Sequence, residues 1–155
     1  MVGDVAMVTG SGSSSICRIF AVGALVATDI FSGGAANAQL SRAWTRCANK
    51  EKASPDLQIS GCTTVIQSGK ETQKNRAVAY TNRGNAYLGK KDYDRAIADY
   101  NKAIELEPKL AAAYANRGLA YGAKGDIDGA IADLDKAIDL NPKLAHAYAN
   151  RGLAY

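Results

Sequence analysis

The chain has 155 residues, of which 47% are apolar and 22% are charged, and its formal net charge is +4. This length suits about one ordinary domain, the composition excludes a disordered chain, and the small charge, with no basic run that alternates with aromatics, argues against a nucleic-acid partner. The single histidine, His146, makes histidine-based metal sites and most histidine-dependent catalysis improbable, so we expect a non-enzymatic protein without metal or cofactor.

Residues 1–38 have the pattern of a secretory signal peptide. An unbroken run of nine apolar residues at 19–27 follows Arg18. As a helix this run rises only about 13 Å, too little for a hydrocarbon core of roughly 30 Å. Small residues then lead to Ala36-Asn37-Ala38, which predicts cleavage before Gln39 and no membrane span afterwards. An uncleaved anchor or a disordered tail is the alternative interpretation.

Three cysteines agree with export. Cys17 lies in the leader, which leaves the pair Cys47 and Cys62 in the mature chain. An even pair in an exported protein indicates a disulfide, and a separation of fifteen suits two adjacent antiparallel helices. Two buried free thiols are the alternative. A metal site is not expected, because two cysteines without nearby histidine do not supply four ligands.

A 34-residue repeat accounts for the second half of the chain. Residues 77–110 and 111–144 agree at 22 of 34 positions, and residues 145–155 agree with 111–121 at 10 of 11. A fixed period of this length predicts a solenoid of stacked helix pairs. The apolar spacing predicts helices at 78–88 and 93–106 in one unit, and at 112–123 and 127–140 in the next.

The ends of these helices carry ordinary capping signals. Asp92 and Asp126 stand where each second helix needs an N-cap. Gly125 fits the position that ends the first helix, and Lys91 takes that place in the preceding unit. Pro108 and Pro142 follow the second helices and stop them.

In period and spacing the units resemble the tetratricopeptide repeat (TPR). The shared pattern is large, small and aromatic in the first helix, then small, bulky, small and proline. It is carried by Tyr80, Gly84, Tyr87, Ala96, Tyr100, Ala103 and Pro108, and again by Tyr114, Gly118, Tyr121, Ala130, Leu134, Ala137 and Pro142. The resemblance implies an all-α, right-handed superhelix of antiparallel helix pairs.

The repeat departs from the family at one position. Arg83, Arg117 and Arg151 stand where the family usually has leucine. Their aliphatic stems can cover apolar surface while the charged heads reach solvent or Asp99 and Asp133.

Residues 39–76 resemble a degenerate unit of the same kind. The stretch 56–66 aligns with 94–104, which puts Cys62 at the position of Tyr100. Trp44 and Cys47 share one face of the presumed first helix, so the disulfide would hold the two helices of a weak repeat together. The connection at 68–76 is about four residues longer than in the later units.

Residues 145–155 match a first helix without its second helix. They are either the start of a further unit or a terminal cap. Tyr148, Gly152 and Tyr155 would then face a missing neighbour, which is either the rest of the array or another molecule. The chain is therefore a candidate for homo-oligomerisation through this helix.

The resemblance implies that the first helices line a concave groove that binds an extended peptide or a partner helix. Side-chain amides there could pair with a peptide backbone whatever its sequence. The alternative is that these asparagines are solvated spacers inherited from one duplicated unit. The expected groove residues are Asn82, Asn85, Asn116, Leu119 and Asn150.

Two of these asparagines, Asn85 and Asn116, match positions of the carboxylate clamp found in chaperone-binding members. Thr81, His146 and Asn150 stand where the clamp has its lysines and arginine. A chaperone C-terminus is therefore not the expected ligand.

Taken together, these patterns predict a bacterial periplasmic or secreted adaptor that binds a protein or peptide. Two alternatives remain open at this stage. One is the N-terminal regulatory part of a longer enzyme, and the other is a self-assembling structural module.

Overall fold

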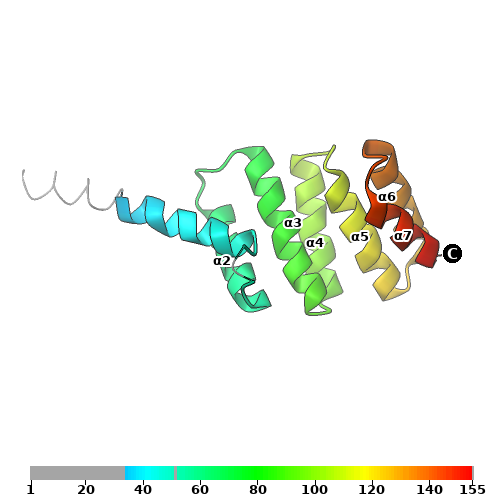
Figure 1. Ribbon diagram of the computed structural model, residues 1–155, viewed down its shortest axis with the longest axis horizontal. Coiled ribbons are helices and arrows are strands. Elements are labelled where there is room, and N and C mark those ends of the chain that lie inside the picture. Colours follow the sequence, from blue (N-terminus) through cyan, green and yellow to red (C-terminus); the bar gives the residue numbers. More distant parts are fainter. Residues whose placement is uncertain (1–33, 51, 155) are drawn as a thin grey trace, which may run out of the picture. The chain divides into compact units, whose positions relative to one another are not determined.

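The computed structural model describes residues 34–50 and 52–154, which form seven helices and no strand (Figure 1). Most of the predicted leader lies outside the described residues. Residues 34–39, at its expected end, are helical and belong to a helix over 34–47, so the predicted cleavage point before Gln39 falls within that helix. None of the described helices combines the length and apolar character needed to cross a membrane.

Two complete helical hairpins follow the 34-residue period. The first pairs α3 (Gln73–Gly89) with α4 (Tyr93–Leu106), and the second pairs α5 (Ala111–Lys124) with α6 (Ile127–Leu140). A last helix, α7 (Ala145–Ala154), packs against α6. The bounds predicted for the second helices, 93–106 and 127–140, are confirmed.

The predicted capping residues are confirmed as well. The Asp92 side chain accepts a hydrogen bond from the Arg95 amide at 3.3 Å, and the Asp126 side chain accepts one from the Gly129 amide at 3.0 Å. Gly125 has a φ of +87°, in the left-handed region where glycine is favoured.

One predicted boundary is wrong. The first helix of the unit 77–110 was expected to start at residue 78, but α3 starts at Gln73. The reason is a local cap, because the Thr72 hydroxyl accepts a hydrogen bond from the Asn75 amide at 3.1 Å. The expected connection at 68–76 is shortened accordingly.

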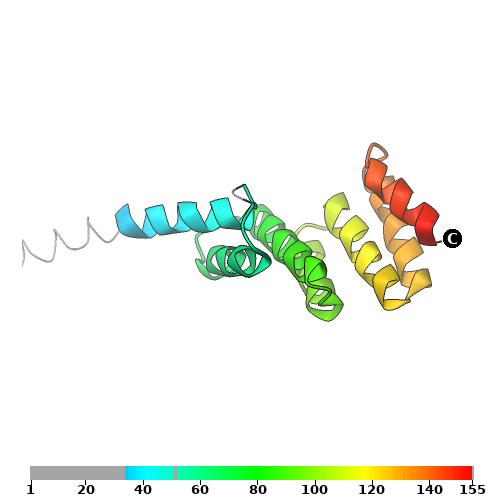
Figure 2. The same ribbon diagram turned by 60° about the horizontal axis from the view of Figure 1, so that its bottom comes forward.

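The first helices form one layer and the second helices form another. Figure 1 shows α3, α5 and α7 on the near side, with α4 and α6 behind them, and Figure 2 separates the successive hairpins by colour. Among the described helices, α3 contacts α5 and α5 contacts α7, whereas α4 and α6 do not contact each other. The layer of first helices is therefore the more tightly curved, concave one.

Glycine allows each first helix to approach its partner closely. A Cβ atom on Gly84 would lie 2.6 Å from the Tyr100 ring, and one on Gly118 would lie 3.0 Å from Leu134 Cγ. Tyr100 and Leu134 are among the largest fully buried side chains of the described chain. The bulky position of each second helix thus packs directly on the glycine of the first.

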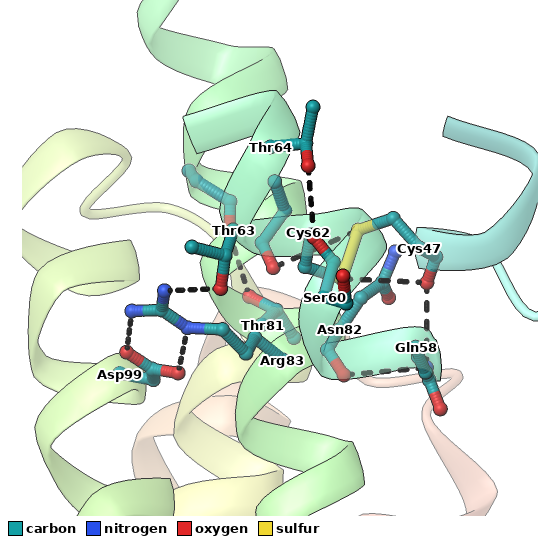
Figure 3. The surroundings of a disulfide bond; sticks show 12 residues. Cys47, Gln58, Ser60, Cys62, Thr63, Thr64, Thr81, Asn82, Arg83 and Asp99 are labelled. Carbon is teal, nitrogen blue, oxygen red and sulfur yellow. Dashed lines mark hydrogen bonds and ion pairs between the residues drawn. A yellow bond between two sulfur atoms is a disulfide. The ribbon is translucent and has the colours of Figure 1, made fainter. Parts of the chain in front are cut away.

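The N-terminal hairpin consists of the helical residues 40–47 and α2 (Pro55–Gln67). The predicted disulfide joins Cys47 to Cys62, with 4.5 Å between the Cα atoms, and both residues are buried (Figure 3). Gln58 Nε2 donates to the carbonyl oxygens of Cys47 and Asn82, each at 3.3 Å, and so ties this hairpin to α3.

An arginine in each complete unit holds three helices together. Arg83 donates from Nε and Nη2 to the two carboxylate oxygens of Asp99, each at 2.8 Å, as expected from the sequence. Its Nη1 also donates to Thr63 of the preceding unit at 3.0 Å (Figure 3). The hydrogen bonds to Asp99 raise the pKa of the Arg83 guanidinium, against the opposing effect of burial.

The same arrangement recurs along the array. Arg117 donates from Nε and Nη2 to the two carboxylate oxygens of Asp133, and its Nη1 donates to Asn101 of the preceding unit. Arg151 Nη1 likewise donates to Asp135 of the unit before it. The bonds to the preceding unit were not predicted. They tie each hairpin to the one before it, because in Arg83 and Arg117 the bidentate bond to aspartate holds the guanidinium that also donates to the preceding unit.

Candidate functional site

Two of the predicted asparagines meet on the concave layer. Asn116 Nδ2 on α5 donates to Asn85 Oδ1 on α3 at 2.7 Å. The same oxygen accepts the Tyr100 hydroxyl of α4 at 2.8 Å. This network, Asn85–Tyr100–Asn116, joins three helices of two successive units.

The network leaves polar groups available to a ligand. Both acceptor positions of Asn85 Oδ1 are used, but its two N–H donors are not part of the network. The Asn116 carbonyl and its second N–H are also outside it. Since Asn85 is exposed and Asn116 is half-buried, these groups are accessible at the surface of the concave layer.

The hydroxyl of Tyr100 holds Asn85 in place. Burial raises the pKa of the Tyr100 phenol well above its ordinary value, with a further contribution from the Asp99 carboxylate. The hydroxyl therefore remains protonated and acts as a donor across the neutral range. A fully buried ring thus sets the orientation of an exposed amide.

Asn82 is not part of the network. Its backbone carbonyl accepts a hydrogen bond from Gln58 Nε2. Within the described residues, no hydrogen bond joins its half-buried side chain to Asn85 or Asn116. Among the expected groove asparagines, the bonded pair is therefore Asn85 and Asn116, and Asn82 lies outside it.

The other two predicted residues lie at a pocket between α5, α6 and α7. The pocket has a volume of about 190 Å³. Leu119 and Ile127 stand at its edge with 40% and 42% of their surface exposed, and Asn150 is the one polar side chain of its lining. The lining consists of Gly118, Leu119, Gly122, Ala123, Ile127, Ala130, Leu134 and Asn150.

The positions that would make a carboxylate clamp carry neither lysine nor arginine. The Thr81 hydroxyl is buried and bonds the Ala77 carbonyl of its own helix at 2.9 Å, so it is turned to the backbone. His146 is exposed at the start of α7, and Asn150 lines the pocket. The site therefore offers amides and apolar surface.

The last helix presents an open face, as the sequence predicts. Tyr148 of α7 is 43% exposed, and a Cβ atom on Gly152 would meet nothing within 4 Å. This face is separate from the Asn85–Tyr100–Asn116 network, which lies on α3, α4 and α5.

Sequence reasoning named the residues of the site but missed its organisation. Neither the bond between Asn85 and Asn116 nor the pocket was predicted. A signal was present, because the two units differ at several pocket positions while they agree at most others. These pairs are Asn85/Leu119, Leu88/Gly122, Gly89/Ala123, Tyr93/Ile127 and Tyr100/Leu134.

The family model described as "Tetratricopeptide repeat" matches residues 77–110 and 111–144, so the chain contains two repeats of this kind. No protein of curated function matches the sequence.

Solved structures share the fold. The Arabidopsis OM64 TPR domain is 22% identical, with a TM-score of 0.66 over 78% of this chain and 94% of that one. A crystal structure of MamA is 25% identical, with a TM-score of 0.65 over 97% of this chain and 85% of that one. The second TPR domain of human RPAP3, in complex with an HSP70 peptide, is 22% identical, with a TM-score of 0.66 over 77% and 97%. The predicted all-α solenoid is thereby confirmed.

Proposed function

We propose that this chain is a non-enzymatic adaptor that binds an extended segment of a partner protein along the groove of α3, α5 and α7. The observation that carries the proposal is the Asn85–Asn116 bond, which fixes two amides with free donors and acceptors on the concave layer. An extended peptide offers matching backbone groups about every second residue. The peptide-bound RPAP3 domain supports the use of this fold for such a ligand.

The ligand we propose is recognised through its backbone and apolar side chains. A carboxylate-terminated chaperone tail is disfavoured, because Thr81, His146 and Asn150 occupy the clamp positions. Binding through neutral amides responds weakly to salt, unlike binding through lysine and arginine. We expect the affinity for a selected peptide to change less than about twofold between low and physiological salt.

We further propose that the adaptor works outside the cytoplasm. The disulfide between Cys47 and Cys62 supports this location, because such bonds persist in oxidising compartments. The test is the intact mass of the protein recovered from a bacterial host without reductant. Export predicts a chain that begins at Gln39 and is two hydrogens lighter than the dithiol, whereas a full-length chain with free thiols would contradict it.

The adaptor function is tested by selecting peptides from a random displayed library and measuring their affinity by calorimetry. Asn116→Ala removes groove amide groups and is expected to weaken binding about tenfold. Asn141→Ala changes an exposed asparagine at the end of α6, outside the first helices, and serves as the control. Equal affinities for the wild type and Asn116→Ala, both folded, would exclude the groove.

A further inference from the structure

The pocket between α5, α6 and α7 exists because one unit lacks a ring that the other unit has. In the unit 77–110 the Tyr100 ring packs on Gly84, and its hydroxyl reaches Asn85 on the groove side. The side chain therefore spans from the buried core to the groove. Tyr93 and Leu88 are the neighbouring large residues at the corresponding positions.

In the unit 111–144 the glycine is kept as Gly118, but the four side chains that surround this place are all different. Leu134 stops short of where the phenol of Tyr100 would reach, and Leu119 offers no acceptor in place of Asn85. Gly122 and Ile127 replace Leu88 and Tyr93. The backbone positions that bring the helices together are kept, so the missing ring volume remains as the 190 Å³ pocket.

We propose that this pocket binds the phenyl ring of a phenylalanine side chain in the partner's segment. The inference rests on the proposed function, since the ring enters from a segment that lies in the groove. An engineered apolar cavity of about 150 Å³ holds benzene, so a pocket of 190 Å³ is large enough for a phenyl ring.

The lining selects phenylalanine over tyrosine. The inner walls, Ala130 and Leu134, are apolar, and a phenol hydroxyl driven against them would lose its hydrogen bond to water. Asn150 is the one polar side chain of the lining, and its amide suits the peptide backbone beside the ring.

The exposed edge of the pocket favours an external ligand over the next helix of an array. The unit 77–110 shows what such a helix would cover, because it is followed by α5 and α6 just as the unit 111–144 would be followed by α7 and one more helix. With α6 in place, Asn85 and Gly89, which correspond to Leu119 and Ala123, are still exposed. A helix after α7 would by the same geometry leave Leu119 and Ala123 open to the groove.

The binding test uses N-acetyl-phenylalaninamide as the probe and the intact chain with ¹³C-labelled methyl groups. We expect saturable shifts at the methyls of Leu119, Ile127 and Leu134, with a dissociation constant of about 1 mM. N-acetyl-tyrosinamide should bind about tenfold more weakly, and N-acetyl-alaninamide should give no saturable shift there. Shifts spread over other methyls, or equal binding of the three probes, would overturn the proposal.

Variants that fill the pocket with larger side chains locate the site. The double variant Leu134→Tyr and Leu119→Asn introduces the Tyr100–Asn85 pair of the preceding unit. The separate variant Gly122→Leu introduces the residue that stands at position 88 of that unit. A Cβ on Gly122 would lie 3.7 Å from the nearest atom, so this second variant is expected to fold. Each should weaken probe binding at least tenfold.

The control variant is Leu57→Ala, which removes an exposed leucine of α2 and should bind the probe as the wild type does. A folded filling variant that keeps wild-type affinity would overturn the proposal. So would a dimer, seen by sedimentation, that disappears when the pocket is filled, because a second copy would then be the occupant.

The outcome for the pocket and the outcome for the adaptor function are separable. If library peptides lose affinity in Asn116→Ala but keep it in the pocket-filling variants, the pocket proposal is overturned and the adaptor function is not. Saturable ring binding in a chain that selects no peptide would sustain the pocket and overturn the adaptor.

Discussion

The repeat at 77–110 and the repeat at 111–144 share the residues that bring their helices together but differ where the second helix reaches the groove. The first fills this place with the Tyr100 ring and bonds it to Asn85. The second places Leu134 there and leaves a pocket. The difference shows that one set of positions maintains the fold while another is free to shape a binding surface.

The N-terminal hairpin has a third kind of residue at the same position of its second helix. Cys62 aligns with Tyr100 and Leu134 and is cross-linked to Cys47. A small side chain at this place would leave little apolar contact between the two helices. The disulfide supplies the connection that the ring supplies in the next unit.

The largest expected effect comes from removing the ring itself. Tyr100→Ala should lower the free energy of unfolding by about 4 kcal/mol, because it empties a fully buried site and frees Asn85. Leu134→Ala should cost less, about 2–3 kcal/mol, because the buried leucine is smaller than tyrosine and carries no hydroxyl that bonds a neighbouring helix. Urea denaturation measures both, and equal losses would contradict the contrast between filled and open units.

Loss of the disulfide should have the next largest effect. Replacing Cys47 and Cys62 together by serine should destabilise the chain by roughly 3 kcal/mol, as expected for a loop of 15 residues. Hydrogen exchange should show the loss mainly in α2. Exchange that rises first in α5 and α6 would contradict a local role for the bond.

The close helix crossings should differ between the units as well. In Gly84→Ala the new methyl would lie 2.6 Å from a ring held by its hydroxyl, at a cost of about 2–3 kcal/mol. In Gly118→Ala the nearest atoms lie at 3.0 Å beside the pocket, and the cost should be about 1 kcal/mol. Thermal unfolding of the two variants compares them directly, and a reversed order would refute the packing argument.

The smallest effect concerns pH. Burial raises the pKa of the Tyr100 phenol above the unfolded value of about 10. A raised pKa in the folded state gives stability that is full below pH 10 and is lost as the pH rises towards the folded value.

Tyr100→Phe should therefore cost about 1 kcal/mol at neutral pH, for the hydrogen bond to Asn85, and flatten the decline of stability above pH 10. Tyr148→Phe, at an exposed tyrosine of α7, controls for the loss of one phenol. An unchanged alkaline slope in Tyr100→Phe would contradict the burial of an ionisable group at this position.

Features set by neighbouring residues could be predicted from the sequence. The period, the caps Asp92 and Asp126 and the stop residues gave the bounds of α4 and α6 correctly. The start of α3 escaped prediction because its cap, Thr72, lies in a stretch where the repeat pattern is lost.

Features set by the distance between units could not be predicted in the same way. The sequence named Asn85, Asn116, Leu119 and Asn150, but not that the first two bond each other or that the last two border a pocket. Their arrangement depends on how closely α3, α5 and α7 stack. That spacing is set by tertiary contacts such as the arginine bonds to the preceding unit.

The central claim is that the concave layer binds a peptide through its amides. The most direct measurement follows the side-chain NH₂ resonances of ¹⁵N-labelled Asn85, Asn116 and Asn150 while a library-selected peptide is added. Peptide binding through these amides predicts saturable shifts of their resonances with one dissociation constant, equal to that from calorimetry. Shifts confined to the outer faces of α4 and α6, with the three amides unchanged, would contradict it.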